Sequence, residues 1–450
     1  EAADLTSFTT KNIAALNTRQ FASLTETQIA ALSTAQVIAL KTSQVVALTT
    51  SGVAALTTAQ IGALGTDQVK AITTTALAAM QTNQVAALNT AQVAALTANQ
   101  IKALTTSEVA SLGTSQVQAL TSTQLGAMST DDVLALTTAQ VGALTTAQLQ
   151  SLSQAQVRTL TSSDVTALST SQLQALSVNQ FKTFSTEDVA ALSTAQLSSI
   201  SGNLLSALTT DNIVAMSSTQ IGALTASQLP ALTTLQITAI EHTDIPSITT
   251  GALAAFTSDQ IVALTPTQVG NLTTDQIKVI TTTQLPGLGT EDINVLSSRQ
   301  IGALTTDQLQ TMTVPQVQAI ASGSLKTLSS DQIRTLSTEQ LAGMSTSQIR
   351  GFDYTQIPAF SSDQISNLTT TEVAAFSTRQ IQAFTTAQVA AFTSWQVPAI
   401  PVENIANMGT AQTAAFSTSQ LSAFTSQQIA ALTVDQRAAF SNAQRTVLGL

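Results

Sequence analysis

Large apolar residues recur along the whole chain with a fixed period of eight residues. When each octad ends on a multiple of eight, its last position holds Leu, Ile, Met or Phe from Phe8 to Leu448. Position 5 is also apolar and departs from this rule only at Thr413, Arg437 and Arg445. The register runs through 56 octads without insertion or deletion. This short fixed period indicates a repeat architecture in which each octad is one structural unit.

The consensus octad, Thr-Thr-x-Gln-Val-x-Ala-Leu, carries the signals of a helix start. In the octad 57–64, Thr57 and Gln60 form the pattern [ST]-x-x-[EQ], which is a capping box. Leu56, just before the cap, and Ile61, at the fourth helical position, form the matching hydrophobic staple. Because both devices recur in nearly every octad, we predict that each octad begins its own helix.

A single long helix or strand does not fit this pattern. The apolar positions alternate in steps of five and three, so each octad advances by eight residues. At ~100° per residue the apolar stripe of one helix would rotate by roughly 80° per octad, and no face would stay apolar. A step of five also reverses the face of a strand.

Proline gives an independent measure of helix length. Five of the eight prolines occupy position 6, which are Pro230, Pro246, Pro286, Pro358 and Pro398. Proline inside a helix removes a hydrogen bond and clashes with the preceding turn. We therefore expect position 6 to lie at or past the helix end in these octads, so that each helix is little more than one turn.

The positions of charged residues within the octad also agree with one helix per octad. Of the 25 acidic residues, 21 lie at positions 3 or 4, where they face the positive N-terminal end of a helix. Eight of the 15 basic residues lie at position 6, near the negative end.

One-turn helices are not stable alone, so the octads must pack on one another. The sequence predicts an all-α solenoid with one helix per octad, in which the apolar positions point inward, alanine at position 7 permits close approach, and Thr and Gln cover the outside. A β-solenoid is the alternative, and the capping pattern and alanine content count against it. We expect residues 1–450 to form one continuous solenoid, with residues 433–450 as an atypical C-terminal cap. The pattern does not set the handedness or the number of residues per coil.

The composition excludes several classes of function. The chain has no cysteine, a single histidine (His242) and a net charge of −10, so thiol chemistry and phosphate-neutralising nucleic-acid binding are not expected. Polar residues interrupt every octad, so no helical segment can span a bilayer. The acidic pairs Asp131-Asp132, Glu187-Asp188 and Glu291-Asp292 are interpreted as helix-start charges. We expect no enzyme, no metal and no cofactor.

A small set of residues departs from the repeat in ways that suggest contacts. Trp395 occupies the variable position 3 and is a candidate for a surface or carbohydrate contact. Leu5 and Phe8 leave the first octad apolar, whereas Arg437 and Arg445 modify the last octads. Because few charges oppose association, we expect these residues to take part in assembly into a homopolymer.

The octads resemble the short Leu-Thr-Thr-x-Gln-Val-x-Ala repeats of very large secreted bacterial surface proteins, which are often described as haem utilisation or adhesion proteins. The resemblance implies an extracellular location at the bacterial surface and a structural or adhesive role. It does not extend to haem, because one histidine and one tyrosine cannot make a recurring ligand set. The leading hypothesis is a secreted structural protein that self-assembles into a filament, sheath or surface layer. The alternatives are a stalk or adhesin segment that presents a binding module, and ice or surface binding through threonine rows.

Overall fold

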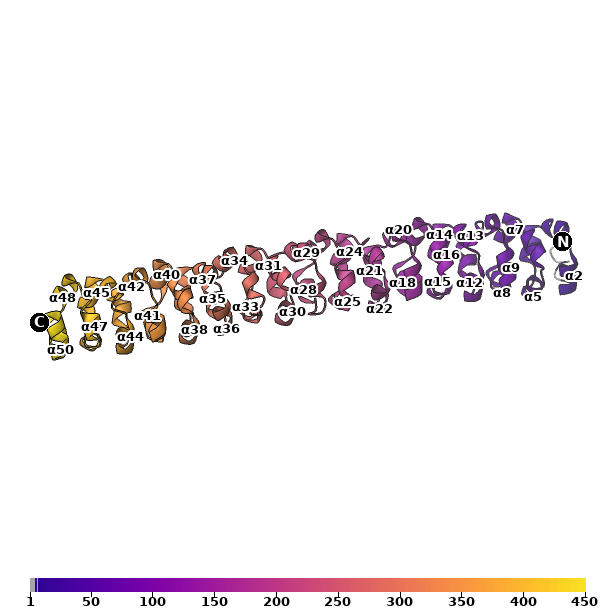
Figure 1. Cartoon of the computed structure of the whole chain (residues 1–450). Helices are drawn as coiled ribbons and strands as arrows, with labels where there is room; N and C mark the ends of the chain where they lie inside the picture. The colour runs from indigo at the N-terminus through magenta and orange to yellow at the C-terminus, as the bar shows by residue number, and fades with distance from the viewer. Residues whose placement is uncertain (1–4, 6) are drawn as a thin grey trace. The chain divides into compact units, whose positions relative to one another are not determined.

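The computed structural model describes residue 5 and residues 7–450. It divides into two compact units, Glu1–Ala223 and Leu224–Leu450, which are treated separately below. Both are built from short helices with brief non-helical links between them (Figure 1), and no strand occurs among the described residues. The all-α solenoid is confirmed, and the β-solenoid alternative is wrong.

The helices keep the octad register. Every α-helix in the described part of the chain begins at position 2 of its octad and ends at position 5, 6 or 7, with one exception. Examples of the three lengths are α10 (Thr74–Leu77), α7 (Thr50–Ala54) and α8 (Thr58–Ala63). The exception is the last helix, α50 (Asn442–Leu448), which extends to position 8. The prediction of one helix of about one turn per octad is therefore confirmed.

The capping box is formed as the sequence predicts. Before α8, the Thr57 hydroxyl accepts a hydrogen bond from the backbone N–H of Gln60 at 3.2 Å, and the Gln60 side chain accepts one from the Thr57 N–H at 2.7 Å. Thr57 has extended backbone angles, whereas the residues after it are helical. Leu64 closes the octad in an extended conformation, and its N–H donates to the carbonyl of Ile61. These local bonds define both ends of the helix.

Octads with proline at position 6 are built differently from the others. They contain 3₁₀-helices, which are η1 (Leu229–Ala231), η2 (Ile245–Ser247), η3 (Leu285–Gly287), η5 (Tyr354–Ala359) and η6 (Val397–Ala399). In η1 the N–H of Ala231, after Pro230, donates to the carbonyl of Gln228 at 3.0 Å. Proline at position 6 thus lies inside a short helix, not at or past its end as expected. The chain accommodates it because the tighter i→i+3 bonds of a 3₁₀-helix do not need the missing N–H. A sixth 3₁₀-helix, η4 (Ser322–Thr327), contains no proline.

The core consists of the side chains at positions 5 and 8, which are buried in nearly every octad. Position 4 is buried as well, and this position is usually glutamine. Gln60, for example, is 2 % exposed. The expectation that glutamine covers the outside is therefore wrong, while threonine at positions 1 and 2 is exposed as predicted, as at Thr57 and Thr58. Burying an amide requires partners, and those partners lie in another octad.

Each octad packs on octads three and four places away within its unit. In the first unit, α18 (Thr138–Ala143) contacts α21 (Ser162–Ala167), three octads later. In the second unit, α30 (Thr250–Ala254) contacts α33 (Thr274–Val279) in the same way. Hydrogen bonds between residues 28 and 31 positions apart join octads that are four apart. One coil of each unit therefore takes between three and four octads, a number that the repeat itself does not reveal.

Among the helices that the structure describes, none combines the length and the apolar character needed to span a bilayer. The continuity of residues 1–450 as one solenoid stays a prediction.

Candidate functional site

The most regular polar arrangement in both units is a ladder formed by the glutamine side chains at position 4. In the first unit, Oε1 of Gln140 accepts a hydrogen bond from the N–H of Thr137 at 2.6 Å. Its Nε2 donates to the carbonyl oxygens of Val109 at 3.1 Å and Leu112 at 2.6 Å. One amide therefore caps its own helix and binds the C-terminal carbonyls of the octad four places earlier. We call this set of bonds the glutamine ladder.

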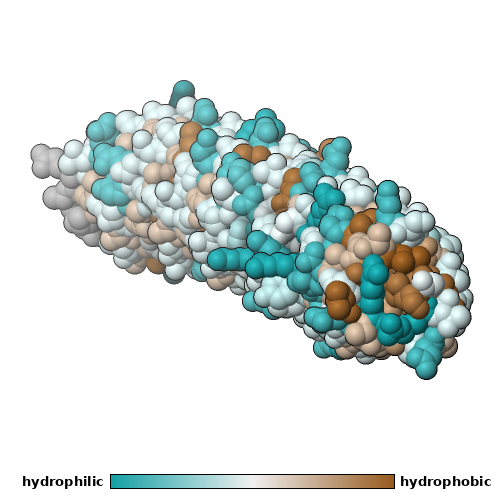
Figure 2. Space-filling view, turned by 90° about the vertical axis from the view of Figure 1, so that its left-hand side faces the viewer, coloured by the Kyte–Doolittle hydropathy of each residue, from teal (hydrophilic) through white to brown (hydrophobic). Residues whose placement is uncertain are grey.

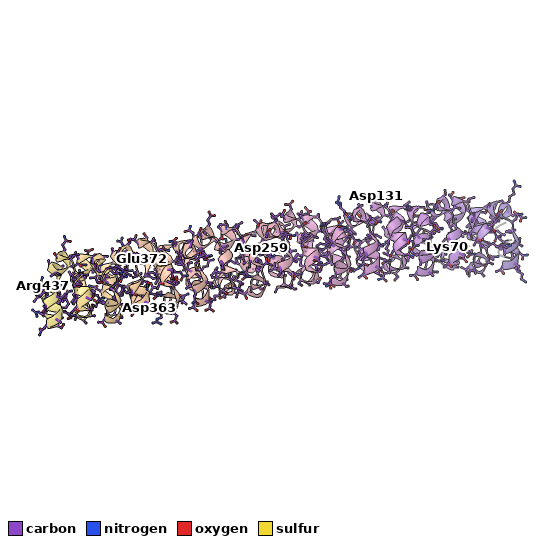
Figure 3. The ribbon with its side chains drawn as sticks, viewed as in Figure 1. Lys70, Asp131, Asp259, Asp363, Glu372 and Arg437 are labelled. Atoms are coloured by element: carbon purple, nitrogen blue, oxygen red, sulfur yellow. The ribbon has the colours of Figure 1, made fainter. Side chains whose placement is uncertain are left out.

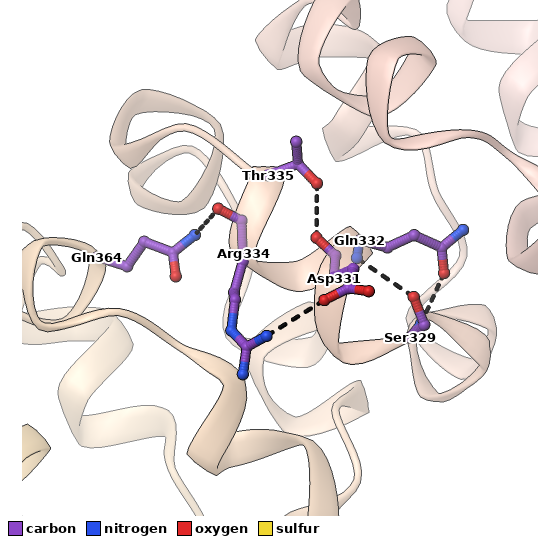
Figure 4. Close-up of polar contacts among 6 residues, drawn as sticks. All are labelled: Ser329, Asp331, Gln332, Arg334, Thr335 and Gln364. Carbon is purple, nitrogen blue, oxygen red and sulfur yellow. Dashed lines mark hydrogen bonds and ion pairs between the residues drawn. The ribbon is translucent and has the colours of Figure 1, made fainter.

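The second unit has the same arrangement, and we call the bonds made by one position-4 side chain a rung. Figure 4 shows parts of two successive rungs, those of Gln332 and Gln364. Gln332 and Ser329 form the capping box of one octad. Gln364, four octads later, donates to the carbonyls of Ile333 and Leu336 at 2.9 and 2.7 Å. It also donates more weakly to the carbonyl of Arg334 at 3.4 Å, which is the contact drawn in Figure 4. The ladder thus satisfies donors at the start of one helix and acceptors at the end of another with a single side chain.

Exposed charges surround the ladder without entering it. The ion pairs Arg334–Asp331, at 3.2 Å, and Lys278–Asp275, at 3.0 Å, each join positions 6 and 3 of one octad. At position 3, the backbone N–H of Glu187 itself lowers the pKa of its exposed carboxyl, with help from the hydroxyls of Thr186 and Ser185. Acidic residues at this position therefore act at the helix start, as the sequence predicts.

Acidic residues at position 4 replace the ladder amide in several octads. Seven of these replacements are buried, namely Glu108, Asp132, Asp164, Asp188, Asp244, Asp292 and Glu372. In Glu108, Asp132, Asp164, Asp188, Asp292 and Glu372, the carboxylate still accepts a hydrogen bond from the N–H of its own N-cap residue. None of them can donate as a carboxylate. Burial raises the pKa of Asp292 and that of Glu372.

Arg437 makes a different connection to the backbone carbonyls of an earlier octad. Its Nε donates to Leu432 at 3.1 Å, and one terminal nitrogen donates to Ile429 at 3.2 Å and Ala430 at 3.4 Å. These acceptors are at positions 8, 5 and 6, the same three that ladder glutamines use elsewhere. Arg437 reaches them from the next octad and not from four octads later. Its guanidinium therefore takes the place of a ladder amide at the C-terminal end of the second unit (Figure 3).

The other predicted assembly residues differ in exposure. Arg445 is exposed and Leu5 is buried at 6 %, whereas Phe8 is 39 % exposed. The carbonyls of Leu5 and Phe8 accept hydrogen bonds from Gln36, so the first described octad already takes part in the ladder. Figure 2 looks onto the C-terminal end, where hydrophobic residues lie exposed among hydrophilic ones. Val447 and Leu450 are exposed there, and α50 ends at Gly449 with φ of 67°. The role of these residues in assembly stays a prediction.

The aromatic residues that depart from the repeat do not lie in one site. Trp395 is 56 % exposed at position 3, as expected for a side chain free to make a surface contact. Tyr354 lies in an open groove with Arg379, whose guanidinium carbon is 5.6 Å from the centre of the tyrosine ring. The sequence does not signal this pair, because its residues are 25 positions apart and come together only through packing between octads.

The isolated histidine and the acidic pairs remain dispersed. His242 is exposed, and no group of three or more His, Cys, Asp or Glu side chains able to hold a metal ion occurs among the described residues. In the pair Asp131-Asp132, the first residue is exposed and the second accepts hydrogen bonds from Ser129. The two neighbouring carboxylates of this pair therefore lie in different environments, one in solvent and the other at a helix cap.

Comparison with known families identifies the repeat. A family model described as the ALTTAQ repeat matches most of the chain in a series of segments. The sequence Ala-Leu-Thr-Thr-Ala-Gln itself occurs, for example, at residues 55–60 and 135–140. The matched segments are 1–34, 37–74, 63–98, 98–130, 109–146, 126–162, 205–234, 237–274, 277–314, 286–322, 317–351, 338–370, 368–400 and 405–442. No curated protein matches the chain.

Proposed function

This chain belongs to the ALTTAQ repeat family, and on that basis we propose that it is a structural protein of the bacterial cell surface. In this proposal the chain works outside the cell, catalyses no reaction and associates with copies of itself into a filament, sheath or layer. In this proposal the repeated octads build the helical solenoid, and exposed residues make the contacts between copies of the chain.

The glutamine ladder is the observation that carries the proposal. Its amides are buried, and each connects helices four octads apart, as Gln148 does with Val117 and Leu120. The most regular buried polar groups are thus committed to holding successive coils together. Stability that comes from repeated contacts between neighbours suits a protein whose task is to extend and bear load.

The exposed surface supports self-association. Charged residues make up 9 % of the chain, and the ion pairs Lys278–Asp275 and Arg334–Asp331 neutralise charges within single octads. Weak net repulsion allows surfaces of the same kind to approach. Large apolar side chains also stand exposed, among them Ile38, Val262 and Leu235, the last at 73 %. Burying such side chains between copies would favour lateral contacts.

Light scattering and electron microscopy of the purified full chain test this proposal. We expect concentration-dependent assembly, and strictly monomeric protein at high concentration in physiological buffer would contradict it. Ile38→Lys with Val262→Lys should reduce assembly. The matched control places the same charges at exposed polar positions, as Thr138→Lys with Thr418→Lys. An equal loss of assembly in both variants would mean that charge, and not the apolar contacts, is responsible.

A stalk that holds a binding module away from the cell is the second candidate, and Arg437 favours it. The guanidinium occupies the carbonyls of Ile429, Ala430 and Leu432, so that ladder bonds from an added octad cannot form there. An octad whose carbonyls are occupied in this way suits a protein that acts as a single chain. Monodisperse particles in microscopy would support this candidate over the filament.

Location can be tested separately from assembly. If the protein is exposed at the surface, an antibody against it should label intact cells of the source organism without permeabilisation. Labelling only after permeabilisation would contradict an extracellular role.

A further inference from the structure

Two positions of the glutamine ladder carry glutamate, and both leave one buried oxygen without a partner. At Glu372, Oε2 accepts a hydrogen bond from the N–H of Thr369 at 2.7 Å. At Glu108, Oε2 accepts one from the N–H of Thr105 at 2.6 Å. Oε1 of each glutamate is fully buried and has no hydrogen-bond partner. Both side chains are 2 % exposed, so solvent does not supply one.

A glutamine at the same octad position shows which hydrogen-bond partner the glutamate lacks. In Gln340, Oε1 accepts from the N–H of Ser337 at 2.8 Å, and Nε2 donates to the carbonyls of Leu309 and Met312 at 2.9 and 2.7 Å. A glutamate at position 4 has the same shape, with an oxygen in place of Nε2. For Glu372 the corresponding carbonyls are those of Leu341 and Met344, and for Glu108 those of Leu77 and Met80. An ionised carboxylate only accepts hydrogen bonds, so its Oε1 cannot complete the rung.

We propose that Glu108 and Glu372 are proton-operated rungs of the ladder. When a proton from solvent binds Oε1, the O–H donates to the carbonyl of Met80 or Met344, 28 residues earlier, and closes the rung. When that proton leaves, an oxygen with negative charge faces carbonyl oxygens and the rung opens. The two units each contain one such rung.

The charged groups around these carboxyls do not supply a substitute for the proton. On the helices packed against α42 (Thr370–Ala375), and on the octads around it, the charged residues are Glu339, Arg350, Asp363, Arg379 and Glu403, all of which are exposed. Arg350 uses its Nε for the carbonyl of Ala375.

Around Glu108 the setting is more acidic. The helix α14 (Thr106–Ser111) packs on α11 (Thr82–Ala86), which has no charge, and on α17 (Thr130–Leu134), which carries Asp131 and the buried Asp132. Lys102, on the preceding octad, is exposed. With no cation buried beside either carboxyl, the neutral acid is the form that fits the packing.

The sign of the pH dependence follows from this geometry. Burial raises the pKa of Glu372 above its ordinary value, so the folded chain holds this proton at a pH where the unfolded chain has lost it. The added stability is fully present below the unfolded pKa and is lost as pH rises through the folded pKa. The Glu372 rung therefore tightens in acid, whereas the glutamine rungs do not respond to pH.

Hydrogen exchange of the full chain, followed by mass spectrometry across a pH series and corrected for intrinsic exchange rates, tests the proposal. Peptides covering 337–344 and 369–376 should gain protection as pH falls. Glu372→Gln should raise their protection roughly tenfold at neutral pH and remove the pH response, because the amide closes the rung permanently. Glu108→Gln should do the same for 73–80 and 105–112. Since both variants restore the consensus residue, they keep the fold.

The matched control converts a glutamine rung into one that depends on a proton. Gln340→Glu should lower protection of 309–312 by a similar factor at neutral pH and restore it in acid. Infrared spectroscopy should show a protonated carboxyl band in the wild type that Glu372→Gln weakens. The proposal is overturned if Glu372→Gln leaves protection and its pH response unchanged. It is also overturned if calcium ions, and not protons, raise the protection of the wild type at neutral pH.

Discussion

The side-chain amide of Gln60 donates a hydrogen bond to the carbonyl oxygen of Leu32 at 2.6 Å, although the two residues are 28 positions apart. The same side chain accepts a hydrogen bond from the N–H of Thr57, three positions away. A residue that the sequence marks as a local helix cap is therefore also the link between coils. This double role explains why glutamine, and not the glutamate that also fits a capping box, dominates position 4.

Replacing Gln60 tests that double role. Gln60→Ala should destabilise its region by about 1–3 kcal/mol, because the Thr57 N–H and the Leu32 carbonyl lose a buried partner. Thr57→Ala removes only the local cap and should cost about 0.5–2 kcal/mol. Hydrogen exchange should show Gln60→Ala loosening residues 29–32 as well as 57–64, whereas Thr57→Ala loosens 57–64 alone. If the two variants affect the same residues, the coil-to-coil bond contributes nothing to stability.

Deletions test the register of the ladder. Without residues 137–144, Gln148 moves into the place of Gln140 and meets Val109 and Leu112 in place of Val117 and Leu120. The fold and its unfolding transition should therefore be retained. Removing only residues 137–140 places caps against core positions and should abolish cooperative unfolding around the site. Thermal unfolding followed by circular dichroism compares the two, and equal stability would rule out a coil held in octad register.

Arg437 gives a prediction about the C-terminal end. Arg437→Ala removes the donors from the carbonyls of Ile429, Ala430 and Leu432, so exchange over residues 425–440 should become faster. Arg445→Ala, at an exposed arginine one octad later, should leave that exchange unchanged. If this end is closed against addition of further octads, Arg437→Ala should also increase association in light scattering. Equal behaviour of the two variants would leave Arg437 without a capping role.

Glycine at a tight coil contact gives a prediction about packing. A Cβ on Gly351 would lie 2.2 Å from the carbonyl oxygen of Ser322, three octads earlier. Gly351→Ala should therefore cost roughly 1–3 kcal/mol, since backbone must move. A Cβ on Gly251, in α30, meets nothing within 4 Å. Gly251→Ala should instead stabilise by roughly 0.4–1 kcal/mol in denaturant unfolding. A neutral Gly351→Ala would show that the coils are packed less closely than described.

The local structure of this protein follows from its sequence. The spacing of [ST]-x-x-[EQ] against apolar positions 5 and 8 predicted one short helix per octad, because capping bonds and staples connect residues only a few positions apart. The capping box of Thr57 and Gln60 therefore forms as predicted. The placement of acidic residues at the helix start follows for the same reason. The assembly and the location stay predictions, as do the assembly roles of Leu5, Phe8, Arg437, Arg445 and Trp395.

Tertiary structure alone decided how the octads stack. Each octad presents nearly the same side chains, so the sequence holds no signal that pairs Gln60 with Leu32 and not with another octad's last residue. The number of octads per coil depends on how closely the backbones of neighbouring coils approach. It also depends on the geometry of the glutamine amide, which must accept a hydrogen bond from its own N-cap residue and donate one to a carbonyl four octads earlier. The same packing places glutamine inside the molecule and leaves Oε1 of Glu108 and Glu372 without a partner.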